Sequence, residues 1–395
     1  MNTASSPRDR AGPLAGLKVV EFAAIGPGPM CGMLLADLGA QVLCVDRTEP
    51  SGLGIERPPR FDLLKRGKRA IKVDLKRPEG LALALALIER ADASIEGFRP
   101  GTMERIGLGP DACLARNPKL VYGRVTGFGQ TGPLARAAGH DLNYIALAGA
   151  LHAIGREGAP PTPPLNLLGD YAGGAMLLAF GIVSAMLSAR ATGAGQVVDA
   201  AMIDGAAALM TPFYGLLAAG LHDGPRGTNL LDSGAPFYDV YRCADGEHVS
   251  VAPIEPKFRE VLLTRLASAG VAVHDLPAFD DRARWPELRR RLTDIFATRS
   301  SAEWCALLEG SDACFAPVLA PLAAPAHPHH VARGTFVCID GIEQPAPAPR
   351  FSATPPTTPT APLAGGDGAE WAGAWGVPAD CIVAALGRTP ASPAT

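Results

Sequence analysis

Strand-like and helix-like segments alternate through the first third of this chain, and this alternation constrains its fold most strongly. The strand-like segments are short and apolar, and they cover Leu17–Phe22, Gln41–Val45, Ala93–Ile95 and Leu120–Val125. The helix-like segments each carry a proline in the first turn, and they cover Pro29–Leu38 and Pro78–Ala91. Strands that alternate with helices usually pair in parallel through right-handed crossovers. The pattern therefore predicts an α/β fold built on a mostly parallel sheet.

A second, smaller unit is predicted between residues 236 and 314. Phe237–Tyr241 and Glu247–Val251 are strand-like, and the Asp245-Gly246 turn between them is typical of a β-hairpin. Helical segments follow at Glu255–Ala269 and Trp285–Leu292. Near the C-terminus, Ala353–Asp367 is rich in proline, threonine and glycine and predicts an extended connection, and Ala379–Leu386 predicts a last helix.

The charge balance argues against a nucleic-acid partner. A chain of 395 residues with a net charge of −3 has no long basic block of the kind that binds a polyanionic duplex. One basic cluster occurs between Arg57 and Lys76, and charge alone favours a solvated face there over a binding site for a small polyanion. The cluster includes Lys65, Arg66, Lys68, Arg69 and Lys72.

Cysteine spacing and the N-terminal segment favour a reducing, cytoplasmic environment. The eight cysteines are scattered without a Cys-x-x-Cys pair, so the spacing supports neither a metal site nor a disulfide framework. Met1–Arg10 is polar and lacks the apolar stretch of a secretory signal. Tyr171–Ala189 carries no charge over 19 residues, but its glycines and the strand-like residues that follow favour a buried helix over a membrane span.

A glycine-rich turn after the first strand has the form of a dinucleotide-binding fingerprint. Gly26–Cys31 follows a strand and opens a helix, and Asp46 ends the next strand. However, Cys31 replaces the glycine that packs helix on strand, and Pro27 and Pro29 lack the amide donors that would hold a pyrophosphate. The sequence therefore favours a tight, shape-defining turn over nicotinamide binding.

Two short runs contain candidate acid/base groups. Gly139–Tyr144 places His140 in a loop, and Leu168–Gly174 places Asp170 where a proline-rich loop gives way to an apolar helix. A neutral imidazole and an ionised carboxylate on opposite sides of one carbon can remove a proton from one face and return it to the other. We expect Asp170 to cap a helix that begins near Tyr171, with the amides of that terminus free to stabilise an oxyanion. Taken alone, each residue is better explained by an ordinary structural role, His140 as a surface or hydrogen-bonding loop residue and Asp170 as a helix cap.

A second carboxylate is a candidate for orienting the histidine. Glu255 lies between Pro253 and Pro256, which stiffen its backbone. A general base is usually oriented by a second polar group, and Glu255 suits that role. The alternative is an acidic residue at a helix N-terminus, with Pro256 in the first turn.

Six motifs occur in a fixed order along the chain. They are Ile25–Pro29, Gly97–Gly101, Gly127–Pro133, Gly139–Tyr144, Gly169–Gly174 and Gly195–Asp199. Together they resemble the family III CoA-transferases, the CaiB/BaiF-like superfamily, and within it the α-methylacyl-CoA racemase branch. The resemblance covers the chain from Ala11 to the C-terminus and is densest between residues 93 and 260.

The resemblance implies a fold and an assembly. It implies a large Rossmann-like domain formed by both ends of the chain, a smaller α/β domain, and a homodimer with interlocked subunits. The implied boundaries are 1–200 for the first part of the large domain, 201–235 for a linker with helices, 236–314 for the small domain and 315–395 for the return linker and the last part of the large domain. CoA thioesters are then bound between the large domain of one subunit and the small domain of the other, and no metal or organic cofactor is expected beyond the CoA of the substrate.

The resemblance also implies roles for individual residues. His140 and Asp170 match the two acid/base residues, and Glu255 matches the carboxylate that pairs with the histidine. The residues that match CoA contacts are Arg47, Val73, Asp74, Leu75, Lys76, Gly97, Phe98, Arg99, Arg105, Gly139, Asp141, Leu142, Asn143 and Tyr144. The residues that match the acyl-binding surface are Ile25, Met202, Leu231 and Tyr238. The segment from Arg47 to Lys65 is longer than expected for a racemase.

Two activities fit this residue set. The first is racemisation of a 2-methylacyl-CoA thioester by proton transfer at the α-carbon. The second is CoA transfer, in which Asp170 attacks the thioester and forms a mixed anhydride. Because a transferase has no need of a histidine–carboxylate pair, His140 and Glu255 favour the racemase. A silent CoA-binding subunit is the third possibility, and the presence of all three polar residues argues against it.

Overall fold

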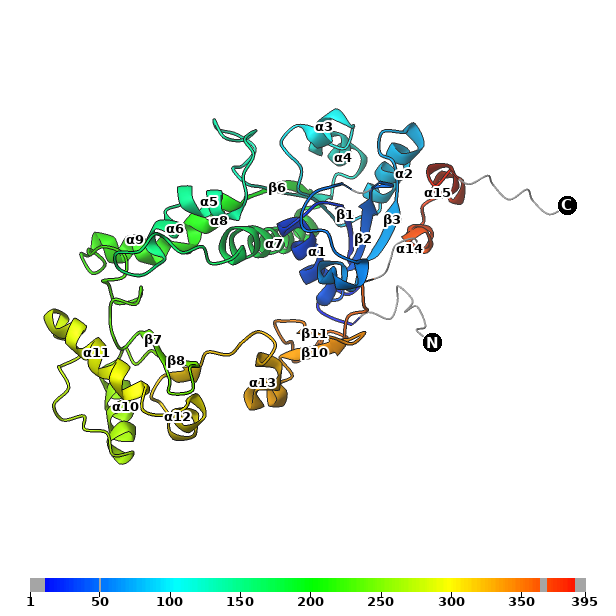
Figure 1. The fold of residues 1–395 in the computed structure, drawn as a ribbon. Helices are drawn as coiled ribbons and strands as arrows, with labels where there is room; N and C mark the ends of the chain where they lie inside the picture. The colour runs from blue at the N-terminus through cyan, green and yellow to red at the C-terminus, as the bar shows by residue number, and fades with distance from the viewer. Residues whose placement is uncertain (1–10, 50, 363–367, 388–395) are drawn as a thin grey trace. The chain divides into compact units, whose positions relative to one another are not determined.

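The computed structural model describes residues 11–49, 51–362 and 368–387, which fold into two compact units (Figure 1). Unit 1 contains the described residues of Met1–Ala148, Leu165–Leu209 and Gly334–Thr395. Unit 2 contains Gly149–Pro164 and Met210–Arg333. The polar N-terminal segment 1–10 and residues 363–367 of the predicted extended connection lie outside the described residues.

A six-stranded parallel sheet forms the centre of unit 1, which confirms the predicted α/β fold class. Its order is β3-β2-β1-β4-β5-β6, and every neighbouring pair is parallel. The strands are β1 (Lys18–Phe22), β2 (Gln41–Asp46), β3 (Arg69–Lys72), β4 (Ala93–Glu96), β5 (Val121–Thr126) and β6 (Gln196–Ala201). The strand order reverses direction between β1 and β4, and in open α/β sheets ligands bind beside such a reversal, at the carboxyl ends of the strands.

Helices cover both faces of this sheet. Alternate residues of one strand enter different hydrophobic cores, since Val20 packs in one cluster and Val19 in the other. The first face is covered by α2 (Pro78–Ile88), α4 (Pro110–Arg116), α14 (Gly368–Ala374) and α15 (Ala379–Ala385). The second face is covered by α1 (Pro27–Asp37) and α7 (Leu177–Thr192). Residues near the C-terminus therefore complete the same core as the first strands.

Shorter elements complete unit 1. The helical ones are η1 (Pro59–Phe61), η2 (Leu63–Lys65), α3 (Thr102–Arg105), α5 (Asp141–Leu147), the π-helical segment η3 (Leu167–Met176) and α8 (Met202–Leu209). A hairpin of β10 (Phe336–Ile339) and β11 (Ile342–Pro345) pairs antiparallel. Helix α8 packs closely on η3, because Gly205 meets Gly173 with no room for a Cβ atom.

The continuous helix of η3 and α7 is long and apolar enough to cross a membrane by length and composition. It spans Leu167–Thr192, and the mean hydropathy of its most apolar window is 1.8. Leu178 and Ile182 are fully buried in the second-face core, and α7 packs against β5 and β6. This packing on a sheet matches the expectation of a core helix.

Unit 2 contains a small antiparallel sheet of order β7-β8-β9. The predicted hairpin is present, with β7 paired to β8 and Gly246 at a positive φ in the turn. The elements of unit 2 are α6 (Ala150–Ala153), α9 (Thr211–Ala218), β7 (Asp239–Arg242), β8 (His248–Val251), α10 (Pro256–Ser268), η4 (Arg282–Arg284), α11 (Trp285–Phe296), α12 (Ser301–Leu308), β9 (Phe315–Pro317), η5 (Ala324–Ala326) and α13 (Pro328–Arg333). Its core is aromatic, with Phe296 packed between the rings of Tyr241 and Trp304.

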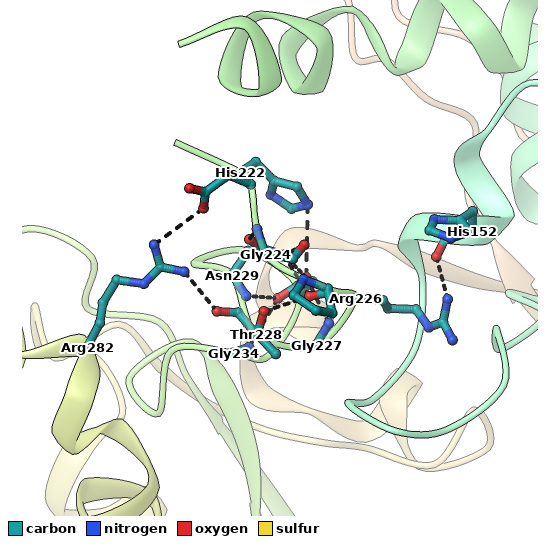
Figure 2. Close-up of polar contacts among 12 residues, drawn as sticks. His152, His222, Gly224, Arg226, Gly227, Thr228, Asn229, Gly234 and Arg282 are labelled. Carbon is teal, nitrogen blue, oxygen red and sulfur yellow. Dashed lines mark hydrogen bonds and ion pairs between the residues drawn. The ribbon is translucent and has the colours of Figure 1, made fainter. Parts of the chain in front are cut away.

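A loop of unit 2, residues 224–234, is held by its own side chains (Figure 2). The Asp232 carboxylate accepts hydrogen bonds from three backbone amides of the loop and from the Asn229 side chain. The Asn229 side chain is turned inward, while Arg226 extends away to the carbonyl oxygen of His152 at 2.8 Å. Because these bonds satisfy the backbone without regular secondary structure, the loop has a defined shape.

Candidate active site

The residues predicted to bind substrate in unit 1 gather at one edge of the sheet. Ile25 follows β1, Arg47 follows β2, Val73–Lys76 follow β3, Gly97–Arg99 follow β4 and Met202 follows β6. Because all six strands are parallel, their carboxyl ends lie on the same side. The structure therefore brings these segments, which are far apart in the sequence, to one edge.

The loops after β1 and β4 meet where the strand order reverses. A Cβ atom on Gly97 would lie 3.4 Å from the Cβ of Ala24, so the two loops are in contact. Gly26 has a φ of +69°, which a residue with a side chain rarely adopts. A Cβ atom on Gly26 would lie 3.4 Å from Oδ2 of Asp170. The glycine turn thus lies directly beside the candidate catalytic carboxylate.

His140 is the residue before the first turn of α5, and its side chain is exposed. Its backbone amide donates to Oδ1 of Asn143 at 3.1 Å. The Tyr144 hydroxyl donates to the carbonyl oxygen of Gly139, and burial raises the pKa of Tyr144 to about 12. A Cβ atom on Gly127 would overlap the Tyr144 ring, so glycine is required for this packing. These contacts give the loop around His140 a fixed conformation.

Asp141 links this loop to the segment that carries Asp170. Its Oδ2 accepts the backbone amides of Gly169 at 2.6 Å and of Asp170 at 2.7 Å. Its side chain is buried, so its expected contact with CoA does not use an exposed carboxylate. The bonds join positions 28 and 29 residues apart and hold the two candidate acid/base residues close together.

The Asp170 carboxylate is half-buried and has a perturbed acidity. Burial raises the pKa of Asp170 above its usual value. The hydrogen bond from Nδ2 of Asn166 at 3.2 Å lowers it, the Asp141 charge raises it and the His140 charge lowers it. Burial therefore outweighs the hydrogen bond from Asn166, and the Asp170 carboxyl holds its proton more tightly than an exposed aspartate does.

The structure corrects two expectations about Asp170. It lies inside the π-helical segment η3, whose preceding cap residue is Asn166, so it is not a helix cap. The Gly169 and Asp170 amides donate to Asp141, so these two do not point outward toward an oxyanion. Both differences arise from tertiary packing. The buried Asp141 carboxylate of α5 accepts hydrogen bonds from backbone amides that would have no partner at an isolated helix N-terminus.

The structure divides the basic cluster, because Arg57, Lys72 and Lys76 are exposed as expected of a solvated face, whereas three other members lie in the interior. Arg66 pairs with Asp37 at 2.6 Å and Lys68 with Glu21 at 2.5 Å, all four side chains being buried, and Arg69 is buried as well. Buried charges require such partners, so these groups stabilise the fold. The basic residues among the predicted CoA contacts are exposed, and they are Arg47, Lys76, Arg99 and Arg105.

A buried ion pair supports the segment after β4. Arg124 donates to Glu96 at 2.7 Å and to Glu104 at 2.9 Å, and Glu96 accepts the backbone amide of Phe98 at 2.8 Å. The Arg47 guanidinium lies 5.7 Å from the centre of the Phe98 ring. The pair therefore fixes two of the predicted CoA-binding residues relative to the sheet.

The remaining predicted site residues belong to unit 2. Glu255 is exposed and occupies the helix N-terminal position before α10, with Pro256 in the first turn, and its role toward His140 stays a prediction. Leu231 lies in the 224–234 loop and Tyr238 just before β7, and both are partly buried.

A sequence model described as CoA-transferase family III matches residues 14–368. The chain belongs to this family. The α-methylacyl-CoA racemases of Mus musculus and Homo sapiens are each 44% identical to it, over 344 and 345 residues respectively, which is 87% of this chain and 87% of each relative. The resemblance carried by the six motifs is thereby confirmed, including its racemase branch.

A solved member of the family has the same fold. The crystal structure of a CaiB/BaiF family protein from Brucella suis matches with a TM-score of 0.79 and 26% sequence identity, and it covers 92% of this chain and 100% of its own. The match covers most of both units, so the parallel sheet and the smaller unit have counterparts in that structure.

The sequence analysis did not identify four residues of this chain whose side chains hold the candidate site or the 224–234 loop in place. Asn166 precedes Asp170 by four residues, a spacing that places both on one side of a helix and offered a signal. Arg124 is a charged residue inside an apolar strand, which indicates a buried partner. Asn229 and Asp232 stand three residues apart in a glycine-rich segment, a pattern typical of a side-chain-bonded loop.

Proposed function

We propose that the chain is a racemase that inverts the α-carbon of 2-methyl-branched acyl-CoA thioesters. The observation that carries this proposal is the bonding of Asp141 to the Gly169 and Asp170 amides, which holds Asp170 near His140. The 44% identity to two α-methylacyl-CoA racemases over most of the chain supports the same reaction class.

The proposed reaction is a two-base proton transfer. One residue of the His140–Asp170 pair takes the α-hydrogen as a proton, and the C–H electron pair moves toward the thioester carbonyl to form an enolate. The other residue then donates a proton to the opposite face, and the roles exchange for the other enantiomer. Each positioned acid or base typically contributes about 10²–10⁴-fold in rate. The proposed reaction needs no metal or organic cofactor, because the thioester itself acidifies the α-hydrogen.

The substrate's CoA portion is assigned to the carboxyl edge of the sheet. Arg47, Lys76, Arg99 and Arg105 are exposed cations there, and phosphate groups bind such side chains through charge-assisted hydrogen bonds. In this proposal Glu255 orients the imidazole of His140, and Ile25, Met202, Leu231 and Tyr238 contact the acyl chain.

We further propose that the protein is a homodimer with interlocked subunits. Helix α7 turns Leu178 and Ile182 toward the sheet, while an apolar stripe on its other side is exposed. The stripe has helical spacing and contains Met176, Phe180, Val183 and Leu187. Contiguous exposed apolar side chains mark interaction surfaces, and a second copy of the chain would cover the stripe on α7.

The eight cysteines are free, which suits the proposed cytoplasmic location.

Isotope exchange tests the proposed activity. In deuterated water, a single enantiomer of a 2-methylacyl-CoA should gain deuterium at the α-carbon while it converts to the other enantiomer. His140→Ala should abolish inversion in both directions, because each direction needs both residues, while α-exchange without inversion should persist only for the enantiomer whose α-hydrogen Asp170 removes. His152→Ala is the matched control, since its side chain is exposed in unit 2 and has no role in the mechanism.

The CoA-transferase alternative predicts a different result. It predicts transfer of CoA to an added carboxylate, and trapping of Asp170 by hydroxylamine through the mixed anhydride. Trapping without α-exchange would replace the racemase proposal with this alternative.

A further inference from the structure

A loop of unit 1 lies at the same edge of the sheet and has no part in the mechanism above. Residues 51–58 are irregular backbone between β2 and η1. Leu53 is 60% exposed and Ile55 is 85% exposed. The loop belongs to the Arg47–Lys65 segment, which we expected to be shorter in a racemase.

The backbone of this loop packs on a predicted acyl-binding residue. Gly54 has a φ of +78°, and a Cβ atom there would lie 3.4 Å from Cγ2 of Ile25. Ile25 is itself 42% exposed. Leu53 and Ile55 flank the glycine that packs on Ile25, and we name these three exposed residues the 25/53/55 group. Single exposed apolar residues are ordinary, whereas contiguous ones indicate a surface that binds an apolar partner.

One end of the 25/53/55 group lies beside Asp170, one of the two proposed acid/base residues. Ile25 is followed by Gly26, where a Cβ atom would lie 3.4 Å from Oδ2 of Asp170. The α-carbon must approach Asp170 for proton transfer, so an acyl chain attached to it starts next to Ile25. An apolar chain that continues along this surface reaches Leu53 and Ile55.

Hydrogen bonds give the loop a defined shape. The Leu53 amide donates to Oγ of Ser51 at 3.2 Å, and the Arg57 guanidinium donates to the Ile55 carbonyl at 3.2 Å. Arg57 also pairs with Asp62 at 2.6 Å. A binding surface that is ordered in advance loses less conformational entropy when a ligand binds.

We propose that Leu53 and Ile55 determine specificity for the acyl chain by contacting its distal part. This inference rests on the proposed racemase function. The occupant is the substrate's apolar chain, because the group is continuous with the position of the reacting carbon. The loop favours long apolar chains over short ones, since only a long chain reaches beyond Ile25 and buries apolar surface on the loop.

The experiment compares a Leu53→Ser/Ile55→Ser double variant with the wild type across 2-methylacyl-CoA thioesters of increasing length. For long chains, kcat/KM of α-exchange should fall roughly tenfold or more, the size expected when several methylene contacts are lost. For the shortest chain, kcat/KM should stay within about twofold of wild type, which also shows that the fold is intact. Leu322→Ser is the matched control, because Leu322 is 95% exposed and lies in unit 2.

The outcomes separate the two proposals. Absence of α-exchange in the wild type with every thioester refutes the racemase function. An active wild type whose chain-length profile is unchanged in the double variant refutes the specificity role. A variant that dissociates in size-exclusion chromatography, with equal losses for long and short chains, assigns the loop to a contact between subunits and likewise overturns the proposal.

Discussion

Replacing Asp141 with alanine tests the central structural argument about the site. The substitution leaves the fold's apolar cores untouched and removes the acceptor of two backbone hydrogen bonds, from Gly169 at 2.6 Å and from Asp170 at 2.7 Å. The Gly169 backbone is buried, and the Asp170 amide is partly so. Both amides would then lack a partner, one of them on the residue that carries the candidate catalytic carboxylate.

The expected loss can be estimated from these two bonds. Each buried donor left without a partner costs about 1–3 kcal/mol, so Asp141→Ala should lower the free energy of unfolding by about 2–6 kcal/mol. This is a large part of the roughly 5–15 kcal/mol that stabilises most proteins. Asp141→Asn keeps one acceptor oxygen and loses the charge, so its cost should be smaller, at about 1–2 kcal/mol.

Two measurements check this prediction. Urea unfolding gives the global free energy, and amide hydrogen exchange gives the local protection of residues 167–176. We expect Asp141→Ala to lose protection at Gly169 and Asp170 and to lower kcat more than it changes KM, because the acid/base residue is displaced. Unchanged protection at these two amides, together with a stability loss below about 1 kcal/mol, would refute the positioning role of Asp141.

Three further predictions follow from the described contacts. Asn166→Ala removes a hydrogen bond that lowers the Asp170 pKa, so the pKa should rise further and the acid limb of the kcat/KM profile, where Asp170 must be ionised, should move to higher pH. Lys68→Met leaves a buried carboxylate unpaired and should cost about 3–5 kcal/mol in urea unfolding. Gly205→Ala should cost about 1–3 kcal/mol, because its Cβ would lie 1.9 Å from the carbonyl oxygen of Gly173.

Matched variants provide the controls for these measurements. Arg284→Met removes an exposed partner of Glu287 and should cost less than about 1 kcal/mol. Gly215→Ala adds a methyl group in helix α9 with no atom within 4 Å, and should stabilise by roughly 0.5–1 kcal/mol. A Lys68 effect as small as that of Arg284, or an acid limb that moves to lower pH on loss of Asn166, would contradict the corresponding argument.

The sequence alone determined the fold class and the family. The alternation of strand-like and helix-like segments predicted a parallel sheet, because that periodicity is local and survives without knowledge of any partner. The motifs around His140 and Asp170 predicted the family, since each is a short contiguous run that needs no tertiary contact to be recognised.

The tertiary structure decided how the charged groups are used. Lys68 and Arg66 are equally basic in the sequence whether they face solvent or a buried carboxylate, and their partners stand 47 and 29 residues away. Asp141 likewise became a support for Asp170 only when η3 was brought against α5. Spacing along the chain determines a helix or a strand, whereas the burial and pairing of a charge depend on which distant segment packs against it.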